Sequence, residues 1–193
     1  MNGTKEYLRS MLPQMLLITA VFIISTAAGY AYTSISPEST VQSLEGFEEL
    51  VEIIKDMPPI GIMLFIFFNN AIKSLIALML GVGFGIVPLL FIISNGYIIG
   101  IIANIVAAEK GMFYVLAAIA PHGIIELPMV LLSAAIGLRI GYETFRAVSG
   151  QEADIKREFV KGVKFFFQWI MPLLFVAAVI ETFVTPLVIT SLS

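Results

Sequence analysis

Five apolar stretches constrain the fold of this chain more than any other feature of its sequence. They lie at about residues 11–33, 60–80, 86–108, 112–140 and 165–190. A transmembrane helix needs about 20 mostly apolar residues to cross roughly 30 Å of hydrocarbon. Each stretch meets that length. The sequence therefore predicts an all-α, polytopic transmembrane helical bundle of about five spans, in a single integral membrane domain over residues 1–193.

The second and third stretches form one apolar block over residues 60–108, which is too long for a single span. Gly81, Gly83 and Gly85 stand close together inside this block. Because clustered glycines mark turns, we expect the chain to turn there and to form two helices.

The composition excludes several classes of protein. Hydrophobic residues make up 59% of the chain and charged residues 13%, and the mean hydropathy is +0.97, whereas a soluble domain carries about 25% charged residues. The 11 Lys and Arg residues form no long basic run, so no nucleic-acid partner is expected. The chain has no cysteine, which excludes disulfides, thiolate metal sites and cysteine nucleophiles. The expected surroundings are a lipid bilayer.

Basic residues predict the orientation of the chain in a cell membrane. Lys5 and Arg9 precede the first span, and a second group of basic residues lies around the segment 141–164. Cytoplasmic loops carry an excess of Lys and Arg, and five spans put both groups on one side. We therefore expect a cytoplasmic N-terminus, an inner basic segment at 141–164 and a C-terminus outside. The start of the chain also has features of a signal peptide, but its long apolar stretch favours an uncleaved anchor.

The segment between the first two spans is acidic. Residues 34–57 contain six Glu or Asp residues and one lysine. Within this segment, the apolar residues of 40–56 recur at helical spacing, which predicts an amphipathic outer helix with one acidic face. Anionic headgroups repel such a face, which favours packing on the protein or on a partner. A solvated face on a connecting helix is the simpler alternative.

Polar side chains inside the apolar stretches are the main candidates for function. Ionisable groups near the centre of a bilayer are costly to bury and usually face the bundle interior or a water-filled cavity. We therefore expect these side chains to converge at mid-depth. This polar midplane cluster consists of Asn69, Asn70, Lys73, Asn95, His122, Glu126 and Glu181, with Asn104 as a further amide on the third span.

An ion pair is expected within the polar midplane cluster. A pair between Lys73 and either Glu126 or Glu181 would offset the cost of burying one charge alone. The remaining carboxyl would then be protonated or paired with a protonated His122. Three interpretations stay open at this point: a satisfied hydrogen-bond network that fixes the helix register, a site for transport or a proton-linked role, and a site for partner binding or a conformational change.

The fourth span is expected to contain a broken helix over Pro121–Pro128. Pro121 suits the first turn of a new helix, whereas Pro128 removes a backbone donor. Broken helices at membrane depth are tolerated where they lie inside protein or line a cavity.

Small residues four positions apart predict where helices approach closely. Gly96 and Gly100 form such a stripe on the third span. Ser133, Gly137 and Gly141 form another on the fourth. We expect both stripes to be helix-packing surfaces.

Catalysis is not expected. A catalytic zinc site usually takes three protein ligands, whereas this chain has one histidine and no cysteine. Ser133 has no adjacent base in a recognisable arrangement. The chain is therefore interpreted as a non-enzyme with no cofactor and no metal.

Four motifs together resemble the stage II sporulation protein M family of integral membrane proteins. They are Phe68-Asn69-Asn70, Gly81-Val82-Gly83-Phe84-Gly85 leading to Pro88, Asn95-Gly96-Tyr97-Ile98-Ile99-Gly100, and Pro121-His122-Gly123-Ile124-Ile125-Glu126-Leu127-Pro128. Each motif is weak alone, but their order and separations over about residues 60–141 are specific. The resemblance implies that the Asn-Asn, Asn-Gly and Pro-His-Gly-x-x-Glu positions form the functional core.

The resemblance also implies a function. In spore-forming bacteria the namesake of the family acts in a membrane complex with cell-wall hydrolases that thins septal peptidoglycan. A non-enzymatic membrane component that recruits or regulates partner proteins of the membrane or envelope is therefore the first expectation.

The residues themselves support an alternative function, a small ion or solute transporter or channel built around the polar midplane cluster. Charges at mid-depth and discontinuous helices are typical of transporters. Five spans are few for a transport path in one subunit, so this alternative implies a homo-oligomer.

Overall fold

The computed structural model describes residues 2–36 and 55–191, and the regular elements in this part of the chain are helices. They are α1 (Asn2–Ser10), α2 (Leu12–Ile35), α5 (Pro59–Met79), the 3₁₀ turn η1 (Leu80–Val82), α6 (Ile86–Lys110), α7 (Met112–Val148), α8 (Ile155–Phe165), the π-helical segment η2 (Phe166–Ile170), α9 (Met171–Phe183) and α10 (Thr185–Thr190). The predicted all-α fold is confirmed.

Five helical runs are long and apolar enough to cross a membrane, and their number is the number that the sequence predicted. They are Leu12–Ile35, Pro59–Val82, Ile86–Lys110, Gly123–Val148 and Ile155–Thr190. The predicted bounds of the last two are corrected, because α7 continues to Val148 and the last run begins at Ile155, so helix occupies most of the predicted inner segment 141–164. The turn within the long apolar block is also confirmed. Gly85 has a φ of 74°, which glycine adopts without steric cost, and α6 begins at the next residue. The predicted amphipathic helix at 40–56 lies almost entirely outside the described residues, so it stays a prediction.

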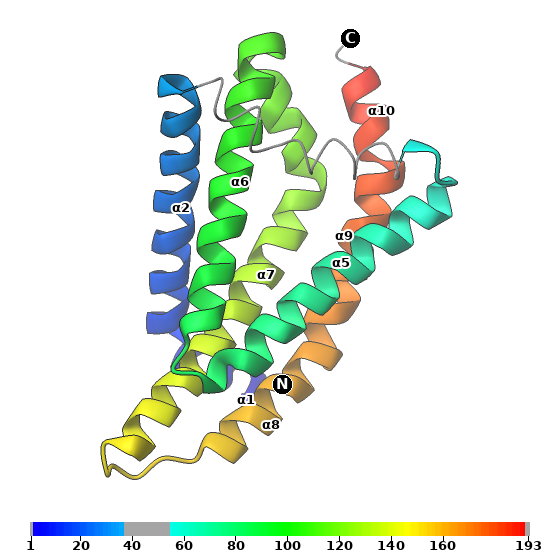
Figure 1. The fold of residues 1–193 in the computed structure, drawn as a ribbon. Helices are drawn as coiled ribbons and strands as arrows, with labels where there is room; N and C mark the ends of the chain where they lie inside the picture. Colours follow the sequence, from blue (N-terminus) through cyan, green and yellow to red (C-terminus); the bar gives the residue numbers. More distant parts are fainter. Residues whose placement is uncertain (1, 37–54, 192–193) are drawn as a thin grey trace.

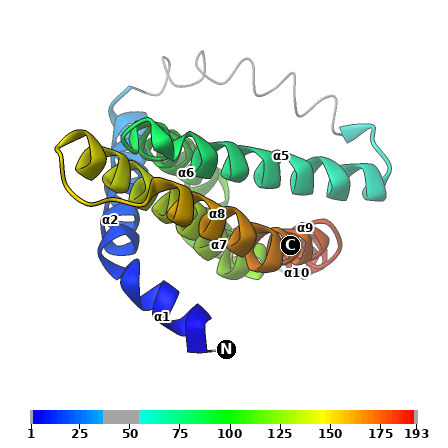
Figure 2. The same cartoon turned by 90° about the horizontal axis from the view of Figure 1, so that it is seen from below.

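The spans form two pairs of helices with α7 between them. α2 and α6 run side by side on one flank of the molecule, and α5 and α9 lie on the other flank (Figure 1). α5 packs on α9 and α7 but has few contacts with α6. The view from below shows α5 running along one edge of the bundle beside α8 (Figure 2). α5 and α6 therefore both pack on α7 but are separated from each other over most of their length.

The basic groups gather at one end of the bundle, which we call the basic end. It is formed by α1, α8 and the α7–α8 turn, whereas the α6–α7 turn and α10 lie at the opposite end (Figure 1). The basic residues that these elements and the last turns of α7 carry are Lys5, Arg9, Arg139, Arg146, Lys156, Arg157, Lys161 and Lys164.

α2 and α6 approach so closely that only glycine fits at their contact. A Cβ atom on Gly100 would overlap the carbonyl oxygen of Thr26 and lie 2.8 Å from the backbone nitrogen of Tyr30. A Cβ atom on Gly96 would lie 2.8 Å from the carbonyl oxygen of Phe22. In lipid the hydrophobic effect does not drive helices together, so they associate through close van der Waals packing of their backbones. The small-residue stripe of α6 therefore packs on α2.

The small-residue stripe of α7 packs on the last turns of α5 and on the turn that follows. Ser133 Oγ donates a hydrogen bond to the carbonyl oxygen of Ser74 at 2.8 Å. A Cβ atom on Gly137 would lie 2.8 Å from the carbonyl oxygen of Ala77, and one on Gly141 would overlap the backbone of the turn before α6. These contacts close the bundle between its middle and the basic end.

The expected break over Pro121–Pro128 is corrected to a bend. Both prolines lie inside α7, which is helical over all of its 37 residues. Figure 1 shows α7 changing direction in its upper half. A proline removes one backbone donor and bends a helix, and neighbouring groups in a membrane bundle satisfy the freed carbonyl. The sequence signal therefore marks a curved helix rather than an interrupted one.

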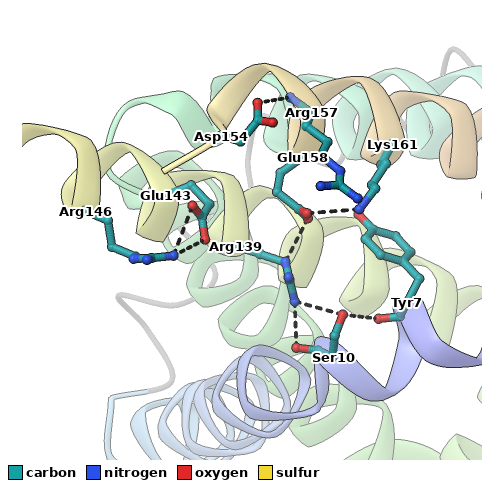
Figure 3. Close-up of polar contacts among 9 residues, drawn as sticks. All are labelled: Tyr7, Ser10, Arg139, Glu143, Arg146, Asp154, Arg157, Glu158 and Lys161. Carbon is teal, nitrogen blue, oxygen red and sulfur yellow. Dashed lines mark hydrogen bonds and ion pairs between the residues drawn. The ribbon is translucent and has the colours of Figure 1, made fainter. Parts of the chain in front are cut away.

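Arg139 joins three helices at the basic end (Figure 3). Its Nε donates to Glu158 Oε2 of α8 at 2.8 Å, and its Nη1 donates to the carbonyl oxygen of Ser10 at the end of α1 at 2.6 Å. Burial raises the pKa of the adjacent Tyr7 hydroxyl, the Glu158 carboxylate raises that pKa further, and Arg139 lowers it by less. The Arg139 side chain therefore links α7 to both α8 and α1. Because partly buried charges are screened less by salt than exposed ones, we expect this link to persist at physiological ionic strength.

The α2–α6 contact generates a first prediction. Replacement Gly100→Ala is expected to lower the stability of the folded protein by about 1–3 kcal/mol, the usual cost of overpacking a close contact. Gly61→Ala in α5 is the matched control, because its Cβ would meet atoms only at ordinary distances of 3.4–3.5 Å. Thermal unfolding of the purified variants in detergent measures the difference. Equal melting temperatures for the two variants would contradict the close packing of α2 on α6.

Candidate functional site

A cavity of about 430 Å³ lies between α5, α6, α7 and α9. Four helices thus contribute to one space, and each brings polar side chains into it. The polar residues that line it are Asn69, Asn70, Asn95, Glu126 and Glu181. Five of the seven residues in the predicted polar midplane cluster therefore come together around one cavity.

The cavity lies at mid-depth and extends toward the α6–α7 turn. At 1.5 Å per residue, Glu126 lies about 20 Å along α7 from Met112, and Asn95 lies about 20 Å along α6 from Lys110. The apolar lining residues include Val106 and Val115, which stand on either side of the turn between those helices. The opposite direction is closed by the contact of α7 with α5. The cavity is therefore polar at mid-depth and apolar toward one end of the bundle.

A second, smaller space of about 40 Å³ adjoins the cavity and shares three of its polar residues, Asn70, Asn95 and Glu126. Lys73 and Ser74 of α5 complete its polar lining. A water molecule needs about 10–15 Å³ of such space and two to four polar partners. This polar annex, lined by both Glu126 and Lys73, has the size and chemistry to hold a few waters.

Glu126 is under-satisfied. Its Oε2 atom is buried and has no hydrogen-bond partner among the residues that the structure describes. Two of the neighbouring amides donate hydrogen bonds to other groups: Asn69 Nδ2 donates to Asn70 Oδ1 at 3.3 Å, and Asn95 Nδ2 donates to the carbonyl oxygen of Phe91 at 3.1 Å. A buried carboxylate oxygen without a partner is costly. A ligand that donates to this oxygen would remove that cost.

The expected ion pairs are wrong. Within the described part of the chain, Lys73 forms no ion pair with Glu126 or with Glu181. The reason is geometric, because Lys73 is exposed and also lines an open groove on the outer side of α5 beside Phe68 and Ile72. The carboxyls of the cavity are therefore not neutralised by the only lysine at this depth of the described helices.

Two further predicted residues are the amide Asn104 of α6 and the imidazole His122 of α7. Asn104 does not line the cavity but donates to the carbonyl oxygen of Tyr30 at 3.1 Å and to Ser34 Oγ at 2.7 Å, so it belongs to the α2–α6 contact. His122 lies in α7 directly before Gly123, which lines the cavity. The placement of the His122 side chain lies outside what the structure describes.

Sequence reasoning missed Ser74. Its Oγ is buried without a hydrogen-bond partner in the described part of the chain, and it lines the polar annex. Ser74 follows Asn70 by four residues, so helical spacing places the two on one face of α5 and could have identified Ser74. Among the described residues, no group of three or more His, Cys, Asp or Glu side chains lies close enough to hold a metal ion.

The geometry of α6 generates a second prediction. The chain contains no cysteine, so single cysteines can be introduced without a background. Ile99 lines the cavity, whereas its neighbour Ile98 is 41% exposed on the outer surface of the bundle. We expect Ile99→Cys to react with a charged, membrane-impermeant thiol reagent in proteoliposomes, because the reactive thiolate needs water. Ile98→Cys at the same depth is expected to stay unmodified in lipid, as measured by mass spectrometry. Equal labelling of the two variants would contradict a water-accessible cavity.

Comparison with known proteins agrees with the motifs. The family model of stage II sporulation protein M matches residues 5–186. The uncharacterized protein MJ0793 of Methanocaldococcus jannaschii is 25% identical over 179 residues, which cover 91% of this chain and 97% of that protein. The uncharacterized protein MJ0706 of the same organism is 28% identical over 169 residues, which cover 83% of this chain and 75% of that protein. No solved structure matches the chain at a significant level. With nearly its whole length matched, this chain belongs to the stage II sporulation protein M family.

Proposed function

We propose that this multi-pass membrane protein binds a small solute in the cavity between α5, α6, α7 and α9 and carries it across the membrane. The observation that carries the proposal is the convergence of five polar side chains from four helices on one cavity, with Glu126 Oε2 unpartnered. Substrate sites of transporters lie at mid-depth between helices. A structural network would instead need its polar atoms satisfied by one another.

The arrangement of the helices is compatible with alternating access. The cavity extends from mid-depth toward the α6–α7 turn, and the contact of α7 with α5 closes it in the other direction. That closure includes the backbone contact at Gly137 and the side-chain hydrogen bond from Ser133, and fully buried core side chains such as Leu78 of α5 and Ile136 of α7 lie in the same region. Alternating access would therefore require these core side chains to repack as the helices move. Opening of this contact would expose the cavity to the basic end.

We place the protein in the cell membrane with its basic end in the cytoplasm. Eight of the 11 Lys and Arg residues lie at the basic end, and cytoplasmic segments carry such an excess. In this orientation the N-terminus is cytoplasmic, the C-terminus is outside, and the cavity extends toward the outer surface. The homo-oligomer expected for a transporter of five spans stays a prediction.

Recruitment of partner proteins, the other expected function, has less support. Its candidate surface, the acidic face of residues 40–56, lies almost entirely outside the described residues. The small-residue stripes that could have received a partner helix are occupied within the chain, by α2 on α6 and by α5 on α7. Recruitment therefore stays a prediction from the family resemblance, and the absence of catalysis stays a prediction from the residues of the chain.

Transport is tested by solute flux into proteoliposomes. A panel of radiolabelled inorganic cations, organic cations, neutral polar solutes and anions is offered to vesicles that contain the protein. We expect saturable uptake of one class, and Glu126→Gln is expected to lower it by about tenfold, because a hydrogen bond to a charged group contributes about 1.5–3 kcal/mol. Glu109→Gln is the matched control, since Glu109 is exposed at the end of α6 and does not line the cavity.

Two results would contradict the transport proposal. One is uptake no faster than into empty vesicles for every member of the panel. The other is uptake that Glu126→Gln leaves unchanged.

A further inference from the structure

We infer that the solute bound in the cavity is an organic cation with an apolar body, such as a quaternary or protonated amine. This inference rests on the proposed function, because it assigns a chemical class to the ligand of the same cavity. It follows from the size of the cavity, the character of its walls and the sign of its charges.

The size of the cavity favours an organic molecule over a bare ion. Its volume of about 430 Å³ lies within the range of about 300–1,000 Å³ that is typical of sites for organic ligands. A dehydrated calcium ion needs six to eight oxygen ligands at about 2.3–2.6 Å, and a space this wide cannot surround one ion so closely. The described residues also contain no group of three carboxyl or imidazole side chains that could hold a metal ion.

The walls favour a ligand with an apolar body. Apolar side chains from α5, α6 and α7 line the cavity beside its polar residues, among them Phe65, Ile99, Ile102, Val106, Val115 and Ile119. A fully hydrated polar solute would leave these side chains against water. When an apolar body binds, its own surface and the apolar wall of the cavity are both removed from water, which stabilises the complex by about 25 cal/mol per Å² of buried apolar surface. The phenyl ring of Phe65 adds a face that attracts cations.

The charges favour a cation. Glu126 and Glu181 are the ionisable residues that line the cavity within the described chain, and Lys73 lines only the adjoining polar annex and the outer groove. An anion in the cavity would therefore meet two carboxyl side chains and no lysine. A cationic head at mid-depth would pair with Glu126, whose Oε2 has no partner in the described chain, while the side-chain amides of Asn70 and Asn95 stand beside it.

Binding is measured by equilibrium dialysis with the full chain in nanodiscs of zwitterionic lipid. Ethidium, a permanent organic cation, is compared with anilinonaphthalene sulfonate, an anion of similar size and aromatic character. Empty nanodiscs correct for partition into lipid. We expect saturable binding of ethidium and none of the anion. Glu126→Gln is expected to weaken ethidium binding by about tenfold, while Glu109→Gln binds it like the unmodified protein.

A second variant tests the cavity without changing its charge. Ala118 lines the apolar wall, and Ala118→Phe is expected to reduce ethidium binding by filling the space that the apolar body needs. Tetramethylammonium, which has the same charge and a much smaller body, is expected to bind this variant as well as the unmodified protein. This variant keeps the inference testable should Glu126→Gln fail to fold, which thermal unfolding reveals.

The failure of this inference differs from the failure of the proposed function. Equal binding of the anion, no saturable ethidium binding, or ethidium binding that both Glu126→Gln and Ala118→Phe leave unchanged would overturn the inference. Flux of a neutral solute or an anion that depends on Glu126 would overturn the inference while supporting transport. Ethidium binding that depends on Glu126, without flux of any solute, would support the inference and overturn transport.

Discussion

Hydrocarbon cannot solvate an amide or a carboxylate, and this constraint decides which way four helices of the chain face. Each of α5, α6, α7 and α9 carries at least one such group at mid-depth. A helix that turned this group toward lipid would lose the free energy of its solvation. Facing one another around a cavity is the arrangement that avoids this cost in all four helices at once. The polar residues therefore account for the orientation of the four helices around the cavity, whether or not a ligand is bound.

The small residues determine where that cavity stops. On one flank, Gly96 and Gly100 bring α6 against α2, and on the other, Ser133 and Gly137 bring α7 against α5. Because α6 is held by α2 and α5 by α7 and α9, α5 and α6 barely touch each other. The space left between them on the side of α7 receives the polar groups. Packing and polarity thus act together, and neither alone would give an open, polar site at this depth.

Much of this could be predicted from the sequence, because the membrane reduces the alternatives. The number of spans, the Gly81–Gly85 turn and both small-residue stripes follow from local spacing alone. The convergence of Asn69, Asn95 and Glu126 follows from the cost of burying them. These features depend on one helix at a time or on a strong solvation penalty.

Other features depend on how separate helices cross, and local spacing does not contain that information. The Lys73 side chain was expected to pair with a carboxyl, but α5 presents it to an open outer groove as well as to the polar annex. The bend of α7 was expected to be a break, because a proline signal does not report whether neighbours satisfy the freed carbonyl. The apolar part of the cavity could not be predicted either. Residues such as Val106 and Val115 look the same whether they face a cavity, lipid or a packed core.

Cross-linking of α5 to α6 through the cavity tests the central claim most directly. Asn70 and Asn95 line both the cavity and the polar annex, from two helices that otherwise barely touch. In this cysteine-free chain, the pair Asn70→Cys and Asn95→Cys is predicted to be joined by a short bifunctional thiol reagent. The pair Ile72→Cys and Ile98→Cys, on the outer surfaces of the same helices, is predicted not to be joined. Cross-linking of the outer pair instead, or of neither pair, would contradict the convergence of the polar residues on one cavity.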